Sequence, residues 1–442
     1  MNESKNNRPV TIRRVTWNPD QANAVVTRFL KRPSIDPKAD TVARQVLEQI
    51  QQRGDAAVLA AVKEFEGAVL TAKKLRVSAA EIKDARDAVD REFKLAATEA
   101  CKRITRFAKA GLSHDWTISS PKGGVLGEQF VPYDRVGAYI PGGAAPLAST
   151  ALMTVTLAKV AGVPEIVACT PAQRDGTVNP FLLYALDLAG ATEIYRVGGI
   201  QAIGAMAYGT KTIASVQKIV GPGGPYVTAA KRLVYGHVAL DSVAGPSEIA
   251  VLADDSASPV HVAADLLSQA EHGTGQEKVL LVTNSGRLAQ KVEAELHRQA
   301  PSLTRVAAVR EVLKKGTLLV VVETLDHGME LINRFAPEHF ELLVHQPRAW
   351  LRKVRSAGAV FVGPWTPECA GDYVAGPSHV LPTGGAAALF SGLTVDDFRR
   401  RTSLVSFTSA DLKDALPVIE AFGRVEGMDA HVRSARARFE AI

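Results

Sequence analysis

The sequence is poor in cysteine and has no long apolar run. Its three cysteines, Cys101, Cys169 and Cys369, are widely spaced and form no CxxC pair. An odd set of isolated cysteines excludes a disulfide framework and favours a reducing compartment. No window approaches the ~20 apolar residues of a membrane span, and the polar start MNESKNNRP is followed by no apolar stretch of signal-peptide type. We therefore expect a cytoplasmic protein with no membrane association.

An excess of charge of one sign is also missing. The formal net charge of +6 is small for 442 residues, and Lys and Arg are scattered apart from short clusters such as the three arginines at 399–401. This distribution argues against a dedicated nucleic-acid surface. The chain is too long for one compact core, so two or more domains are expected.

Two stretches repeat a strand, a glycine turn and a helix. From residue 136, VGAYIPGG leads into STALMTVTLAKVAG, and TEIYRVGG and VQKIVGPGG are likewise followed by helical patterns. A second set runs from EIAVLAD at residue 248 to AGAVFVG near residue 361. This recurrence is typical of parallel sheets wound with helices. We predict an α/β fold of two Rossmann-like doubly wound lobes, with a helical N-terminal region and a small C-terminal helical tail domain.

The glycine-rich turns permit two interpretations. No GxGxxG motif occurs, but the turns at Gly198-Gly199 and at 221–224 follow strand-like runs. Helix N-termini after such turns can face phosphate groups. Glycines that serve only tight turns would give the same pattern.

Candidate metal ligands lie on the helix PVHVAADLLSQAEHG. Gln269 and His272 are three residues apart and therefore share a face, so that both can hold one metal ion. On spacing alone, a histidine before a capping glycine is more often favoured by the helix dipole.

Other chemistry-bearing residues stand at turns. Glu338 and His339 are adjacent at a helix-to-strand junction, where they can serve as bases for an alcohol proton and for water. The irregular segment TPECAGDYVAGPSHVLPTGG carries Asp372 and His379, and a long turn beside a strand end is where α/β proteins usually bind ligands. Cys369 in the same segment has small apolar neighbours, which favour a packed thiol.

Together these segments resemble the histidinol dehydrogenase family. VGAYIPGG, RVGGIQAI, KIVGPGG, AGPSE, LLSQAEHG, APEHFEL, GDYVAGPSHVLPTGG and EGMDAH occur in the family's order, from about residue 40 to the end. The resemblance implies one Zn²⁺ per subunit, held by Gln269, His272, Asp372 and His431, and the catalytic pair Glu338 and His339. It places these residues near the substrate: Ser247, Gln269, His272, His339, Asp372, His379, Glu426 and His431. It also implies that Tyr139, Gln201 and Gly224 face NAD.

The predicted domains follow from this resemblance. They are an N-terminal arm (1–30), a first lobe that carries the zinc and catalytic residues (31–138 plus 247–390), a second lobe that faces NAD (139–246), and a C-terminal domain (391–442). In the family the C-terminal residues reach the partner's site across a dimer, which explains a tail without its own core. The family's GPGN turn is GPGG here, so Gly224 replaces an asparagine that normally contacts NAD.

The implied reaction is a four-electron oxidation of L-histidinol, through bound histidinal, to L-histidine, as in the last steps of histidine biosynthesis. His339 would take the alcohol proton and Glu338 would activate water for the aldehyde. An alternative is a paralogue that oxidises another primary alcohol, such as a hydroxylated sulfonate, although Glu426 favours an amino alcohol. A silent binding protein would be expected to lack Glu338 or His339, and a zinc hydrolase would not bind NAD.

Overall fold

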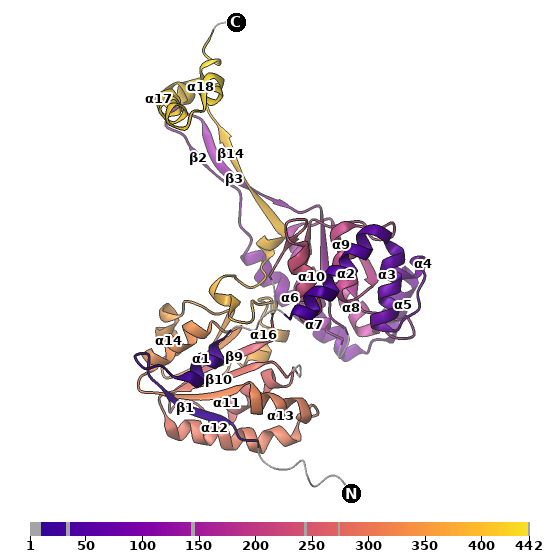
Figure 1. Ribbon diagram of the computed structural model, residues 1–442, viewed down its shortest axis with the longest axis vertical. Coiled ribbons are helices and arrows are strands. Elements are labelled where there is room, and N and C mark those ends of the chain that lie inside the picture. The colour runs from indigo at the N-terminus through magenta and orange to yellow at the C-terminus, as the bar shows by residue number, and fades with distance from the viewer. Residues whose placement is uncertain (1–9, 32–35, 143–145, 243–244, 273–274, 441–442) are drawn as a thin grey trace.

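Two α/β lobes and a projecting arm make up the fold (Figure 1). The computed structural model describes residues 10–31, 36–142, 146–242, 245–272 and 275–440. A mixed α/β fold with parallel sheets and a helical C-terminal end is thereby confirmed. In the described part of the chain, no helix combines the length and apolar character that a membrane crossing requires.

The first lobe, here called the six-stranded lobe, contains an all-parallel sheet in the order β1-β11-β10-β9-β12-β13. Its strands are β1 (Arg13–Trp17), β9 (Glu248–Ala253), β10 (Lys278–Thr283), β11 (Thr317–Val322), β12 (His339–Leu343) and β13 (Ala359–Val362). The central strands are apolar runs buried on both faces, as a sheet covered by helices requires. The helices on one face are α11 (Pro259–Ala270), α12 (Gly286–Gln299) and α13 (Val306–Lys315), and those on the other are α1 (Ala24–Leu30) and α14 (Leu325–Phe335).

The second lobe, here called the five-stranded lobe, also has a parallel sheet, in the order β6-β5-β4-β7-β8. Its strands are β4 (Arg135–Tyr139), β5 (Glu165–Thr170), β6 (Glu193–Arg196), β7 (Lys218–Val220) and β8 (Ala239–Leu240). The chain enters at β4, builds outward to β6, and then crosses to β7. The strand order therefore reverses between β4 and β7, which is where doubly wound sheets bind ligands. The helices that connect these strands are α7 (Ala148–Ala161), α8 (Pro180–Ala189), α9 (Gly199–Tyr208) and α10 (Pro225–Val234).

The N-terminal helices pack on the five-stranded lobe, whereas the predicted domain division places residues 31–138 in the other lobe. They are α2 (Pro37–Arg53), α3 (Asp55–Ala61), the π-helix η1 (Val62–Glu66), α4 (Ala72–Leu75), α5 (Ala79–Ala88) and α6 (Arg91–Ala110). The apolar face of α2 is buried with α9 and α10, and that of α6 with α7. The amphipathic pattern predicts that each helix has a buried face, but it does not specify which sheet covers that face.

The first thirty residues are also not a separate arm. Strand β1 pairs in parallel with β11 at the edge of the six-stranded sheet, and α1 packs through Val26 into its core. Likewise β4, which the predicted boundary at residue 138 would cut, is the central strand of the five-stranded sheet. Both lobes therefore recruit segments from the N-terminal third of the chain.

A three-stranded antiparallel arm projects from the lobes and carries the tail (Figure 1). The arm consists of β2 (Trp116–Ser119), β3 (Val125–Pro132) and β14 (Arg399–Ser406), and the tail consists of α17 (Ser409–Glu426) and α18 (Asp429–Arg436). Gly427 ends α17 in the left-handed region at φ 67°, which a glycine adopts without strain. Large apolar side chains on this unit are exposed, including Val405, Phe422 and Val425.

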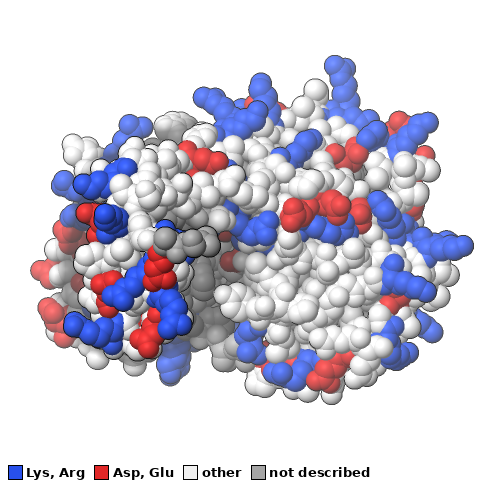
Figure 2. All heavy atoms as spheres, turned by 90° about the horizontal axis from the view of Figure 1, so that it is seen from above, with Lys and Arg blue, Asp and Glu red and all other residues white. Residues whose placement is uncertain are grey.

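Acidic and basic side chains are interspersed on the face shown in Figure 2. On that face no continuous basic stripe is visible, in keeping with the small net charge of the chain.

Candidate active site

The catalytic candidates lie at the predicted junction between a helix and a strand. Helix α14 ends at Phe335, and β12 begins at His339, so that Glu338 and His339 stand at the amino end of a central strand. Both side chains are buried, at 6% and 3% exposure. Both are held by the first residue of β9. Glu338 Oε2 accepts a hydrogen bond from the Glu248 backbone N–H at 2.9 Å, and His339 Nδ1 lies 3.1 Å from the Glu248 carbonyl oxygen.

This contact identifies the basic nitrogen of His339. A carbonyl oxygen only accepts hydrogen bonds, so Nδ1 carries the proton and Nε2 bears the free lone pair. Burial lowers the pKa of His339 to about 4, which keeps the ring neutral near pH 7. Burial, with the charges of nearby carboxylates, raises the pKa of Glu338 well above its ordinary value. The arrangement therefore supplies a neutral imidazole as a general base.

Helix α16 (Glu368–Tyr373) brings two more carboxylates to His339. Glu368 Oε1 lies 3.6 Å from His339 Nε2, and Asp372, Glu368 and His339 offer ligand atoms within 4.8 Å of one another. Burial raises the pKa of Glu368 to about 8, with a further contribution from the charge of Asp372. Burial would also raise the pKa of Asp372, but the hydrogen bond and charge of His379 outweigh it and lower that pKa. The cluster thus contains one carboxylate that stays ionised, as a metal ligand must.

Helix α11 contacts the cluster through Ser268, whose hydroxyl donates to Glu368 Oε2 at 3.0 Å, and Gln269 is the next residue of the helix. Ser258 caps the helix by accepting from the His261 N–H, and Pro259 occupies its first turn. Gln269 is fully buried, yet neither its amide oxygen nor its nitrogen has a hydrogen-bond partner. His272 lies two residues beyond the end of α11 and is exposed. Its electrostatic interaction with Asp372 contributes to the lowered pKa of that carboxyl group. A buried unpaired amide is costly in an apolar interior, so this one fits a ligand position.

His379 connects the cluster to the other lobe. Its Nδ1 lies 3.2 Å from the Asp372 carbonyl oxygen, and its Nε2 lies 3.1 Å from Thr150 Oγ1 on α7. Ser247 is half-buried immediately before β9, next to the residue that holds the catalytic pair. The candidate site is therefore assembled where the amino ends of the six-stranded sheet meet the five-stranded lobe.

Glu426 and His431 are the two predicted residues that the single chain does not bring to this cluster. They line a depression of 250 Å³ on the tail together with apolar side chains such as Val418 and Phe422. Figure 1 shows α17 and α18 at the far end of the arm, away from α16.

The predicted cofactor residues lie at the carboxyl ends of the five-stranded sheet. Tyr139 ends β4 and is buried, and its hydroxyl accepts from the Gly199 N–H at 3.2 Å. Gln201 is also buried, and its amide donates to Glu66 Oε1 at 2.7 Å. Gly224 is the N-cap of α10, beside the point where the strand order reverses. These three positions therefore surround the expected ligand crevice of this sheet.

The turn at Gly198 is occupied by a side chain of the protein itself. The Gly198 N–H donates to Glu66 Oε1 at 2.9 Å, and the Ala172 N–H donates to Glu66 Oε2 at 2.7 Å. A carboxylate thus fills the position that a phosphate would take at the start of α9. Of the two interpretations of this turn, the structure favours the structural one.

The sequence did not indicate the roles of three carboxylates, of which Glu248 and Glu368 are buried and Glu66 is half-buried. In the sequence, Glu248 only marks the start of a strand, and Glu368 has no assigned role. Glu66 lies in a helical segment more than a hundred residues before Gln201. A charged residue next to apolar or small residues in the sequence can indicate a buried carboxylate, but it does not show which residue that carboxylate contacts. The prediction that the Cys369 thiol is packed is wrong, because this residue is exposed.

These features define a two-lobed α/β enzyme with an acid–base pair, a candidate metal cluster and a ligand crevice. Residues 30–439 match the histidinol dehydrogenase family. A histidinol dehydrogenase of Heliobacterium mobile is 45% identical over 413 residues, which are 93% of this chain and 96% of that protein. One from a Synechococcus species is 43% identical, with 96% of this chain and 98% of that protein covered.

The solved structures agree with the sequences. The crystal structure of histidinol dehydrogenase from Elizabethkingia anophelis superposes with a TM-score of 0.92 at 35% identity, over 98% of this chain and 99% of that one. The chain belongs to the histidinol dehydrogenase family and is an oxidoreductase.

Proposed function

We propose that the chain catalyses the NAD-linked, zinc-dependent oxidation of L-histidinol to L-histidine through bound histidinal. Family membership supports the reaction class. The observation that carries the proposal is the buried pair Glu338 and His339, with a neutral imidazole whose Nε2 faces the carboxylates of α16. NAD bound at the five-stranded lobe would supply the hydride acceptor.

The donor set suits a zinc ion. Gln269 contributes an amide without a hydrogen-bond partner, Asp372 an ionised carboxylate, and His272 an imidazole at the end of the same helix as Gln269. We assign the fourth position to His431 of a second copy of the chain, with one ion per subunit. Mixed nitrogen and oxygen ligands are usual for zinc. Bound there, zinc would supply a Lewis acid that attracts the nitrogen atoms of the substrate.

The residues of the chain divide the acid–base work. In the first step, His339 Nε2 accepts the hydroxyl proton of the alcohol as hydride departs to NAD. In the second step, Glu338 takes a proton from water, which adds to the aldehyde carbon before the second hydride leaves. Because burial raises the pKa of Glu338, its carboxylate is a stronger base than an exposed glutamate. Ser247 and His379 line the same space and are assigned to substrate binding.

A homodimer completes this proposal. The tail exposes Phe422 and Val425 at 62% and 80%, and its Glu426 and His431 share one depression. Apolar patches of this kind mark interaction surfaces. A twofold contact would bring the tail of one subunit to the α16 cluster of the other and would add Glu426 as a partner for the substrate's ammonium group.

The test is NADH formation with histidinol against a panel of primary alcohols, with and without added zinc. We expect two molecules of NADH for each histidinol and loss of turnover after chelation, with the fold retained. Turnover of a hydroxylated sulfonate in place of histidinol would favour the paralogue. Hydrolysis without NAD binding would indicate a zinc hydrolase, and NAD binding without turnover a silent binding protein.

A further inference from the structure

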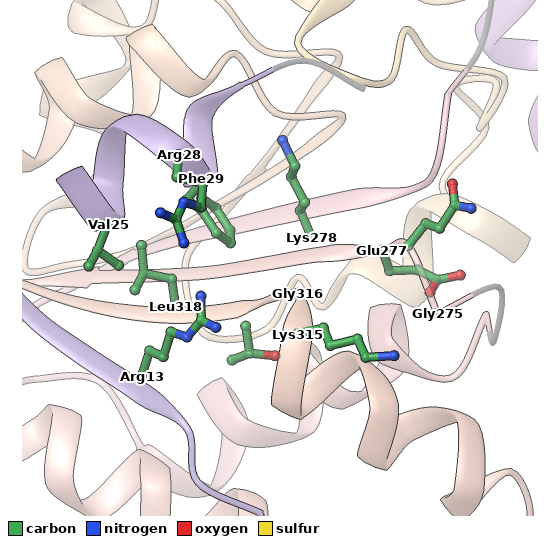
Figure 3. Close-up of a pocket in the computed structure, with 12 residues that line it drawn as sticks. Arg13, Val25, Arg28, Phe29, Gly275, Glu277, Lys278, Lys315, Gly316 and Leu318 are labelled. Atoms are coloured by element: carbon green, nitrogen blue, oxygen red, sulfur yellow. The ribbon is translucent and has the colours of Figure 1, made fainter. Parts of the chain in front are cut away.

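A basic pocket lies at the edge of the six-stranded lobe, apart from the candidate active site. It has a volume of 210 Å³ and is formed where β1, β10 and β11 begin and α1 passes over them (Figure 3). Four cationic side chains line it: Arg13, Arg28, Lys278 and Lys315. Phe29 and Leu318 add an apolar wall. Glu277 is the carboxylate among the lining residues, and Lys315 pairs with Glu311 at 2.6 Å. The charges of Arg13, Arg28 and Lys278 are therefore in excess.

The two arginines are available to a ligand. Among the described residues, neither Arg13 nor Arg28 makes a side-chain hydrogen bond or ion pair. They come from different elements, β1 and α1, and both enter the lining of one pocket. Unpaired like charges that converge on a cavity repel one another, and a bound anion would relieve that repulsion.

Lys278 is held in place at the pocket wall. Its ammonium group donates to the Lys31 carbonyl oxygen at 2.7 Å and lies 5.6 Å from the ring centroid of Phe29. Burial lowers the pKa of Lys278, so an anion nearby would favour its charged form. The ammonium is thus positioned before any ligand arrives, which reduces the entropy lost on binding.

From this geometry we propose that the pocket binds the phosphate group of a small ligand, either inorganic phosphate or a phosphomonoester. Guanidinium groups match the tetrahedral oxygens of phosphate through paired hydrogen bonds. The volume lies below the ~300–1,000 Å³ that is usual for larger ligands, which excludes a dinucleotide. The wall of Phe29 and Leu318 suits a short organic group attached to the phosphate. This site is additional to the oxidation reaction and does not depend on it.

The pocket is linked to the catalytic pair through the sheet. Lys278 donates its backbone N–H to the Ser247 carbonyl oxygen at 3.1 Å and pairs with Glu248 across β10 and β9. Glu248 in turn contacts Glu338 and His339. One strand, β9, therefore lies between β10, which lines the pocket, and β12, which begins at His339.

The test is isothermal titration calorimetry of the full-length protein with inorganic phosphate and, separately, with glycerol 3-phosphate. We expect saturable binding at one site per chain, weakened about tenfold by Arg13→Ala and by Arg28→Ala, since each change removes charged hydrogen bonds. Arg14→Ala is the matched control. It removes the same charge from the adjacent position of β1, but Arg14 pairs with Glu293 on α12, which covers the other face of the sheet.

The outcomes are distinct. Tighter binding of glycerol 3-phosphate identifies a phosphomonoester as the ligand class, and tighter binding of inorganic phosphate identifies the free anion. Absence of saturable binding for both probes would overturn the proposal. An equal loss in Arg13→Ala and Arg14→Ala would also overturn it, because it would indicate general electrostatics. Binding that is unchanged in Arg13→Ala and Arg28→Ala would overturn it as well, because the phosphate would then bind elsewhere, such as at the metal cluster.

Discussion

The amide nitrogen of Gln201 donates to Glu66 Oε1 at 2.7 Å, and the same carboxyl group accepts the backbone N–H groups of Gly198 and Ala172. One half-buried carboxylate thereby fixes a side chain proposed to face NAD and the turn that precedes α9. Burial raises the pKa of Glu66, and these three hydrogen bonds oppose that rise.

Glu66→Gln should weaken NAD binding selectively. A glutamine side chain has one oxygen and one NH₂ group. The NH₂ group would face an N–H donor that the carboxylate oxygen now accepts from, so that hydrogen bond would be lost. We expect the KM for NAD to rise about three- to tenfold, as for loss of one or two hydrogen bonds. The KM for histidinol should stay constant. Steady-state kinetics would check this, with the exposed Glu64→Gln as control; equal rises in both KM values would contradict the role.

Gly224→Asn should improve NAD binding. Gly224 has φ −68°, which any residue adopts, and an added Cβ would meet nothing within 4 Å. The substitution restores the asparagine of the family's turn without strain, so a several-fold lower KM for NAD is expected. Gly223→Asn is the control, because its Cβ would lie 2.3 Å from Val227 Cγ1 and should lower the melting temperature. An unchanged KM in a folded Gly224→Asn protein would show that NAD does not contact this turn.

Asp411 should make the stability of the junction between the arm and the tail depend on pH. It is buried and accepts from Ser120 Oγ, from the Gly124 N–H and from Thr408, which joins the tip of the arm to α17. Burial would raise its pKa, but these hydrogen bonds outweigh burial and lower the pKa below the ordinary 3.8. A lowered carboxyl pKa stabilises the fold above that ordinary value, and the stabilisation disappears as the pH falls below it.

The expected result is that Asp411→Asn destabilises the protein at neutral pH. The difference from wild type should be constant above pH ~4 and shrink in more acidic solution. Urea unfolding at a series of pH values would measure it, with Asp414→Asn on the exposed side of α17 as control. A difference that grows on acidification would refute the assignment.

Much of the fold was predictable because its signals are local. The recurrence of a short apolar strand, a glycine turn and a helix predicted both parallel sheets. The partner of α2 was not predictable. Its apolar face fits any complementary surface, and the choice of the five-stranded lobe is made by tertiary packing.

At the site, Glu338 and His339 could be predicted because they are adjacent in the sequence. Contacts between residues that are far apart in the sequence could not be predicted. Glu66 lies 135 positions before Gln201, and Glu248 contacts His339 from another strand. No periodic pattern encodes such pairs. The spacing of Gln269 and His272 permits a shared metal ion, but similarity to a family was needed to choose that role over a structural one.

Glu338→Gln should slow the second oxidation more than the first. Only hydration of the aldehyde needs an activated water, while the alcohol proton goes to His339. A loss of about 10²–10⁴-fold is expected for a removed general base. Single-turnover measurements with histidinol and with added histidinal separate the two steps. Oxidation of histidinal at the normal rate by the variant would show that Glu338 does not activate water.

The tail prediction concerns His431 and the second subunit. If His431 serves the neighbouring subunit's zinc, two inactive variants should rescue each other. In a mixed dimer of His272→Ala and His431→Ala, one site carries both changes and the other carries neither. Random exchange makes half of the dimers mixed, so about a quarter of the wild-type activity should return. Co-expression with two different affinity tags allows the mixed dimers to be purified and counted. Full inactivity of purified mixed dimers would place His431 in the site of its own subunit or outside the site.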